Sequence, residues 1–96
     1  MTLESVREEI CRIDYALIDL IAERQHLAAA VIGGEKHQTG APVTDPDQRT
    51  LVLNRAFEYA VTQNIDPVEV RKIFDILIAM NEERQKEYSG GEGNLP

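Results

Sequence analysis

Hydrophobic residues recur at alternating spacings of three and four through the first third of the chain. The positions that carry this pattern are Leu3, Val6, Ile10, Ile13, Leu17, Leu20, Arg24, Leu27 and Val31. A mean spacing of about 3.5 residues is typical of a helix that carries a coiled-coil-like seam. Eight of these nine residues are aliphatic, and the ninth is Arg24. A permanent cation therefore stands on the face that a helix normally buries.

This first helix is predicted to begin after Thr2, a good N-cap residue, and to end near Lys36, because the following sequence HQTGAP is typical of a turn. At roughly 1.5 Å per residue, such a helix is about 50 Å long. That length is too great for a compact domain of 96 residues. We therefore expect part of the seam to pack against another chain.

Two further helices are predicted from a start signal that occurs twice. Asp45 precedes Pro46, and Asp66 precedes Pro67. Each pair places a favourable N-cap residue before a proline at the first helical position, where the missing N–H of proline costs nothing.

The second helix is predicted to end at about Gln63 and the third at about Tyr88. No segment shows the alternating pattern of a strand. The sequence therefore predicts an all-α fold of three helices, one long and two shorter. We expect a single domain over residues 1–88 and a disordered tail at 89–96, where SGGEGNLP is typical of a frayed end.

The composition narrows the classes of partner. A net charge of −7 argues against nucleic acid or an anionic membrane as the main partner, although it leaves a small anionic ligand open. The single Cys11 excludes an intramolecular disulfide and fits a reducing compartment. No signal peptide is visible, and no apolar run approaches the roughly 18 residues of a membrane span. We expect a cytoplasmic protein.

Polar side chains continue apolar stripes in all three predicted helices. The stripe of the third helix runs through Phe74, Ile78, Asn81 and Gln85. Arg49 lies on an apolar face of the second helix, as Arg24 does in the first. Because a buried charge or unpaired amide costs several kcal/mol, these residues together predict a shared polar pocket. Clustered arginines are best suited to a carboxylate or phosphate, which they bind bidentately.

Each of these residues also has a plainer interpretation. Arg24 could extend to solvent or pair with a neighbouring carboxylate, and Asn81 could set the register of a helical seam. Gln48 could serve only the helix start, and Arg49 could be a solvated surface residue. It is the combination that favours a pocket.

Covalent and metal chemistry find little support in the sequence. Cys11 has no neighbouring histidine to activate it, and His26 and His37 lack carboxylates at ligand spacing. No glycine-rich phosphate loop occurs. The remaining candidates are cations and amides, which position a ligand and stabilise its charge.

The segments VREEICRIDYALIDLIAER, Lys36, GAPVTDPDQR and IFDILIAMNEERQKEY together resemble the AroQ-class chorismate mutases, over about residues 3 to 88. The resemblance implies an intertwined all-helical homodimer. It also implies the conversion of chorismate to prephenate by a Claisen rearrangement, a step toward phenylalanine and tyrosine, with no cofactor and no metal.

The resemblance also implies roles for individual residues. Arg24 and Arg7, the latter reaching in from the partner chain, would bind the two substrate carboxylates. Lys36 and Gln85 would donate hydrogen bonds to the ether oxygen of the breaking bond. Arg24, Lys36 and Gln85 are thus the implied catalytic residues. Asp45 would lie at the mouth of the site.

The remaining implied substrate-binding residues are Asn81, which would help to hold a carboxylate, and Gln48 and Arg49. At these last two positions the family usually has Arg followed by Glu, and the Glu accepts the substrate hydroxyl. Arg49 would supply the missing cation, while the hydroxyl acceptor is left open between Asp45 and Asp47.

The interval from Arg24 to Lys36 is one residue longer than the family usually has. On an ideal helix its twelve residues overshoot the starting face by about 120°. We therefore predict a local irregularity at Gly33-Gly34 that returns Lys36 to the pocket. Arg7 and Lys36 lie more than about 40 Å apart on one straight helix, so both can touch one ligand only from different chains.

Two alternatives remain open from the sequence. An isochorismate-pyruvate lyase on the same scaffold would use a similar cationic pocket. A non-catalytic, ligand-binding helical dimer would keep the pocket without turnover, and the residues at Gln48 and Arg49 are what favour it.

Overall fold

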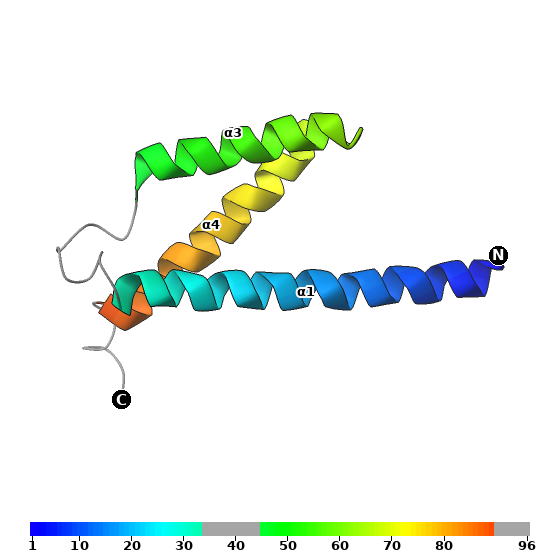
Figure 1. Cartoon of the computed structure of the whole chain (residues 1–96), viewed down its shortest axis with the longest axis horizontal. Helices are drawn as coiled ribbons and strands as arrows, with labels where there is room; N and C mark the ends of the chain where they lie inside the picture. Colours follow the sequence, from blue (N-terminus) through cyan, green and yellow to red (C-terminus); the bar gives the residue numbers. More distant parts are fainter. Residues whose placement is uncertain (34–44, 90–96) are drawn as a thin grey trace.

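The computed structural model describes residues 1–33 and 45–89, which form three helices (Figure 1). These are α1 (Leu3–Gly33), α3 (Pro46–Thr62) and α4 (Pro67–Ser89). No strand occurs in these two ranges, so the predicted all-α fold of one long and two shorter helices is confirmed. The predicted helix end near Lys36, the Gly34 part of the irregularity predicted at Gly33-Gly34, and residues 90–96 of the tail predicted at 89–96 lie outside the described residues. Ser89, the first residue of that predicted tail, is the last residue of α4.

All three helices begin where the capping signals predict. The side chains of Thr2, Asp45 and Asp66 each accept a hydrogen bond from a backbone N–H in the first turn, at 3.0 to 3.1 Å. These bonds satisfy N–H groups that have no partner inside a helix. The caps fix the first residue of α3 and α4, and thereby the rotational phase of each helix.

A short turn joins α3 to α4 in an antiparallel hairpin. Asn64 adopts a left-handed backbone conformation with φ of 60°, which asparagine tolerates better than most residues. The N–H of Ile65 reaches back to the carbonyl oxygen of Ala60 at 3.1 Å, as in a Schellman C-cap. This closure fixes the direction in which the chain enters α4.

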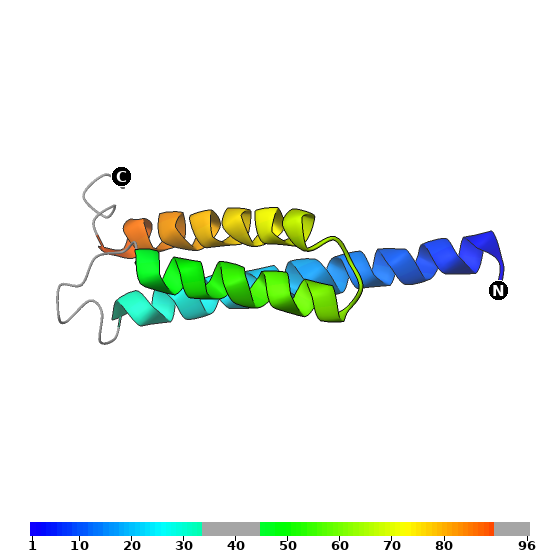
Figure 2. The same ribbon diagram turned by 90° about the horizontal axis from the view of Figure 1, so that it is seen from above.

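The central helix of the fold is α4, which packs against both α3 and the C-terminal part of α1 (Figures 1 and 2). The buried aliphatic residues are Ala28, Val52, Ala56, Ala60 and Ile78. Three of these five are alanines, which let the helix backbones approach closely. The core is therefore small, and it lies along the faces that α4 shares with α3 and with α1.

The N-terminal half of α1 extends well beyond α3 and α4 (Figures 1 and 2). Its seam residues Ile10, Ile13, Leu17 and Leu20 are 47 to 60% exposed. Among residues 1–33 and 45–89 this half of the predicted seam has no packing partner. None of the helices in the described ranges is long and apolar enough to cross a lipid bilayer.

Candidate active site

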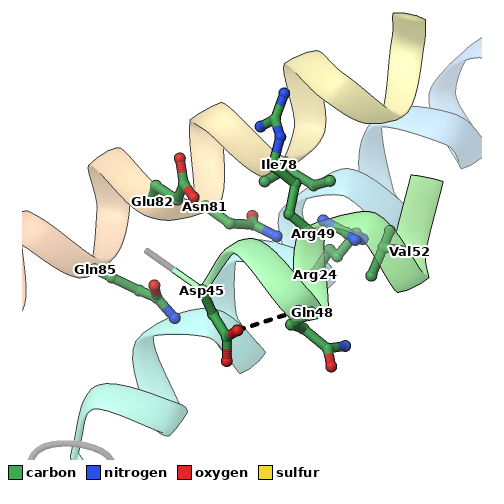
Figure 3. A pocket seen from close by; sticks show the side chains of 9 residues that line it. All are labelled: Arg24, Asp45, Gln48, Arg49, Val52, Ile78, Asn81, Glu82 and Gln85. Carbon is green, nitrogen blue, oxygen red and sulfur yellow. Dashed lines mark hydrogen bonds between the residues drawn. The ribbon is translucent and has the colours of Figure 1, made fainter. Parts of the chain in front are cut away.

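A cavity of about 170 Å³ lies where the three helices meet (Figure 3). Its lining residues are Arg24 of α1, Asp45, Gln48, Arg49 and Val52 of α3 and its N-cap, and Ile78, Asn81, Glu82 and Gln85 of α4. The structure thus brings together six of the eight residues that the sequence assigns to a site. Val52 and Ile78 are both buried and form an apolar wall of the pocket.

Arg24 is the α1 residue of this pocket, and it is half-buried. Its Nη1 is buried and has no hydrogen-bond partner among the described residues. The guanidinium lies 5.8 Å from the centre of the Phe74 ring, which stabilises the cation from one face. Burial, and then repulsion by Arg55, lowers the pKa of Arg24, but an arginine stays charged at neutral pH. A buried, unpaired cationic donor is well placed for an anion.

Gln85 is the buried polar residue of α4, with 8% of its surface exposed. Its Nε2 donates to the carbonyl oxygen of Ala28 at 3.2 Å and so ties α4 to α1. A carboxamide nitrogen carries two hydrogens, so one N–H remains for a ligand. Asn81 lies one turn earlier on α4 and lines the same pocket.

The α3 side of the pocket is shaped by two interactions. The Asp45 side chain accepts from the Gln48 backbone N–H at 3.1 Å, so this carboxylate serves the helix start. Arg49 forms an ion pair with Asp75 of α4. Figure 3 shows the Arg49 guanidinium directed along α4 and away from Gln85. The cation that the sequence assigns to the substrate is therefore held at the edge of the cavity.

The charged lining residues balance within the part of the chain that the structure describes. Arg24 and Arg49 are cations, and Asp45 and Glu82 are carboxylates. A ligand with two negative charges therefore meets no excess of positive charge from these four side chains.

Glu82 is the charged pocket residue that sequence reasoning missed. The sequence leaves the hydroxyl acceptor open between Asp45 and Asp47, but Asp47 lines a different hollow, on the outer side of α3. Glu82 follows Ile78 by four residues and so shares a face with it, a signal that could have found it.

Of the other two predicted site residues, Arg7 belongs to the part of the chain that the structure describes and Lys36 does not. Arg7 is on α1, about 25 Å from Arg24 at roughly 1.5 Å per residue, so it does not reach the cavity of its own chain. Lys36 lies outside the described residues, and its assignment stays a prediction.

Comparison with known proteins gives this arrangement a family. The family model of chorismate mutase type II matches residues 6–86. The chain belongs to that family. A chorismate mutase from Methanocaldococcus jannaschii is 37% identical over 86 residues, which cover 90% of this chain and 86% of the relative. A 4-amino-4-deoxychorismate mutase from Streptomyces venezuelae is 29% identical over 76 residues, which cover 79% of this chain and 73% of that relative.

Membership of the chorismate mutase type II family confirms the resemblance drawn from the sequence motifs. The matched range includes Arg7, Arg24 and Gln85, and it ends one residue beyond Gln85. It therefore contains the three-helix pocket in full.

Proposed function

We propose that this chain is a chorismate mutase, which converts chorismate to prephenate. The observation that carries the proposal is the buried, unpaired Nη1 of Arg24, in a polar pocket with Asn81 and Gln85, in a chain of the chorismate mutase type II family. Chorismate carries two carboxylates. A guanidinium presents parallel N–H groups that match one carboxylate bidentately.

The reaction requires positioning and charge stabilisation rather than a nucleophile. The substrate must fold so that the carbon atoms that become bonded approach each other, and the pocket contributes by holding that compact conformer. As the C–O bond breaks and the C–C bond forms, negative charge grows on the ether oxygen. The free N–H of Gln85 donates to this oxygen, and its burial strengthens the interaction. On the family resemblance, Lys36 is the second donor.

A second chain completes the site in this proposal. The charged lining residues cancel within residues 1–33 and 45–89, and on the family resemblance Lys36 adds one cation, so a dianion needs a further cation. The cavity of about 170 Å³ is also smaller than the roughly 300–1,000 Å³ of typical small-molecule sites. Arg7 of a partner chain supplies a cation for the second carboxylate. The exposed seam of α1 provides the surface for this pairing, and a twofold dimer then contains two equal sites.

The proposed enzyme uses no cofactor and acts in the cytoplasm, on the route to phenylalanine and tyrosine. Its single cysteine supports that location, since thiols in the cytoplasm are kept reduced.

The test is a chorismate-consumption assay with identification of the product by NMR. Wild-type protein should form prephenate at an enzymatic rate. The Gln85→Ala variant should lose about 10²–10³-fold in kcat, because one transition-state donor is removed. Gln63→Ala is the matched control, because Gln63 lies at the far end of α3 and bonds to the Tyr59 hydroxyl. It should keep wild-type activity.

Absence of prephenate from folded protein would contradict the proposal. Isochorismate would then be the next substrate, and release of pyruvate would assign the lyase. Calorimetric binding of chorismate without turnover would assign the ligand-binding module.

A further inference from the structure

Chorismate poses a hydrogen-bonding problem that donors to its carboxylates and ether oxygen do not solve. These groups only accept hydrogen bonds, and the ring hydroxyl is the single O–H donor of the molecule. A hydroxyl that leaves water without finding an acceptor costs binding free energy. The pocket should therefore contain one acceptor for this group. The inference rests on the proposed function, because it assumes chorismate in this cavity.

Only two carboxylates line the cavity among the described residues. Asp45 is exposed, and its side chain already accepts from the N–H of Gln48. Glu82 is half-buried and lines the pocket from α4. It has no hydrogen bond or ion pair within residues 1–33 and 45–89. A carboxylate is the stronger acceptor beside the neutral amides of the cavity.

The unpaired state of Glu82 contrasts with that of the other carboxylates on α4. Glu69 pairs with Lys72, Asp75 with Arg49, Glu83 with Lys86 and Glu87 with Arg84. Of the five, Glu82 is the one that faces the cavity and lacks a partner there. Figure 3 places it beside Asn81, on the α4 wall of the pocket.

We propose that Glu82 accepts the hydrogen bond of the substrate's ring hydroxyl and thereby determines specificity for that ring position. An unpaired carboxylate near a dianionic ligand is unfavourable unless the ligand offers it a donor. Glu82 therefore selects for substrates with a hydrogen-bond donor at this ring position, since a ring without a donor leaves the carboxylate unpaired and desolvated. A ring ammonium at the same carbon would satisfy the same acceptor, so the shared chemistry is a hydrogen-bond donor at that position.

The experiment combines removal of the acceptor with removal of the donor. Wild type, Glu82→Ala and the control Glu83→Gln are assayed with chorismate and with its analogue in which hydrogen replaces the ring hydroxyl. Glu82→Ala should lower kcat/KM for chorismate about 10- to 100-fold, the usual range for a hydrogen bond to a charged group. The kcat/KM of the wild type should be lower by a similar factor with the deoxy analogue than with chorismate. With the deoxy analogue as substrate, the kcat/KM of Glu82→Ala should be less than about threefold below that of the wild type. The substitution then removes an acceptor whose hydrogen-bond donor is already absent.

Three results would overturn the assignment. Glu82→Ala could match Glu83→Gln on chorismate, which would remove any role. Glu82→Ala could lower kcat/KM as much with the deoxy analogue as with chorismate, which would indicate a structural effect. Thermal melting of the variant checks its folding. With 4-amino-4-deoxychorismate as substrate, Glu82→Gln should lower kcat/KM at least as much as it does with chorismate, because a charge pair is broken. A smaller decrease of kcat/KM with the amine than with chorismate would contradict the proposal.

The proposed function fails separately from this inference. If wild-type protein does not convert chorismate at all, the enzyme assignment is wrong. If it converts chorismate while the Glu82 variants behave like Glu83→Gln, the enzyme assignment stands and the role of Glu82 is wrong.

Discussion

The two halves of α1 share one hydrophobic spacing, yet only the C-terminal half packs against another helix among the described residues. In the C-terminal half, Ala28, which follows the seam residue Leu27, is buried against α4 and its carbonyl oxygen accepts from Gln85, while Leu27 itself is 63% exposed. In the N-terminal half, seam residues such as Ile13 and Leu17 are about half exposed, at 47% and 53%. The periodicity thus indicates that a face will be covered, but it does not say by which chain.

Arg24 lies in the half of α1 that is packed, as the next seam residue after Leu20. The position explains why an arginine is tolerated on the seam. Its stem packs in the three-helix junction and its guanidinium enters the pocket, where a ligand anion offsets the burial cost. The exposed half carries only aliphatic residues on its seam, as expected of a surface for a second chain.

The largest effect on activity is expected from a substitution in the exposed seam of the N-terminal half of α1. Leu17→Asp places a charge in the proposed dimer seam, once for each chain, at a cost of several kcal/mol. The variant should become monomeric and lose at least about 10²-fold in chorismate turnover, because Arg7 of the partner is withdrawn. Light scattering and the chorismate assay measure the two effects.

Tyr15→Asp is the matched control, because Tyr15 is 67% exposed on the same helix but stands off the seam. It should remain dimeric and active. A Leu17→Asp protein that stays dimeric and active would show that the seam is not the interface.

A smaller effect on activity is expected from a substitution in the C-terminal half of α1. Arg24→Lys keeps the charge but loses the bidentate fork, so kcat/KM for chorismate should fall about 10- to 100-fold. The control is Arg71→Lys, because Arg71 also lies over a phenylalanine, 5.3 Å from the Phe57 ring, but outside the pocket. Equal activities of the two variants would argue against Arg24 as a substrate ligand.

The smallest effect compares the same substitution in the two halves. Ala28→Leu adds volume to a residue that is 9% exposed, and overpacking should lower the free energy of unfolding by about 1–3 kcal/mol. Ala16→Leu, at an exposed position of the other half, should change it by less than about 0.5 kcal/mol. Urea denaturation at one fixed protein concentration measures both, since a dimer's stability depends on concentration. Equal losses would mean that both halves are packed alike.

The helices and their first residues could be predicted from local signals alone. Asp45 and Asp66 cap α3 and α4 as predicted, because a cap depends only on neighbours in the sequence. The meeting of Arg24, Asn81 and Gln85 could also be predicted, since each interrupts an apolar stripe.

The interactions that the sequence missed depend on how helices cross. The ion pair of Arg49 with Asp75 and the entry of Glu82 into the cavity require the crossing and register of α3 and α4. Periodicity gives the inner face of a helix but not the residue that it meets on another helix. The placement of Lys36 lies outside the described residues and remains a prediction.

The most direct test of a site shared between two chains is complementation. Arg7→Ala and Arg24→Ala proteins, each assayed alone, should be nearly inactive. After denaturation together in equal amounts and refolding, half of the dimers should be mixed, and each mixed dimer contains one intact site of two. The mixture should therefore recover about a quarter of wild-type turnover. If differently tagged chains are shown to exchange and no activity returns, Arg7 and Arg24 do not serve one site from two chains.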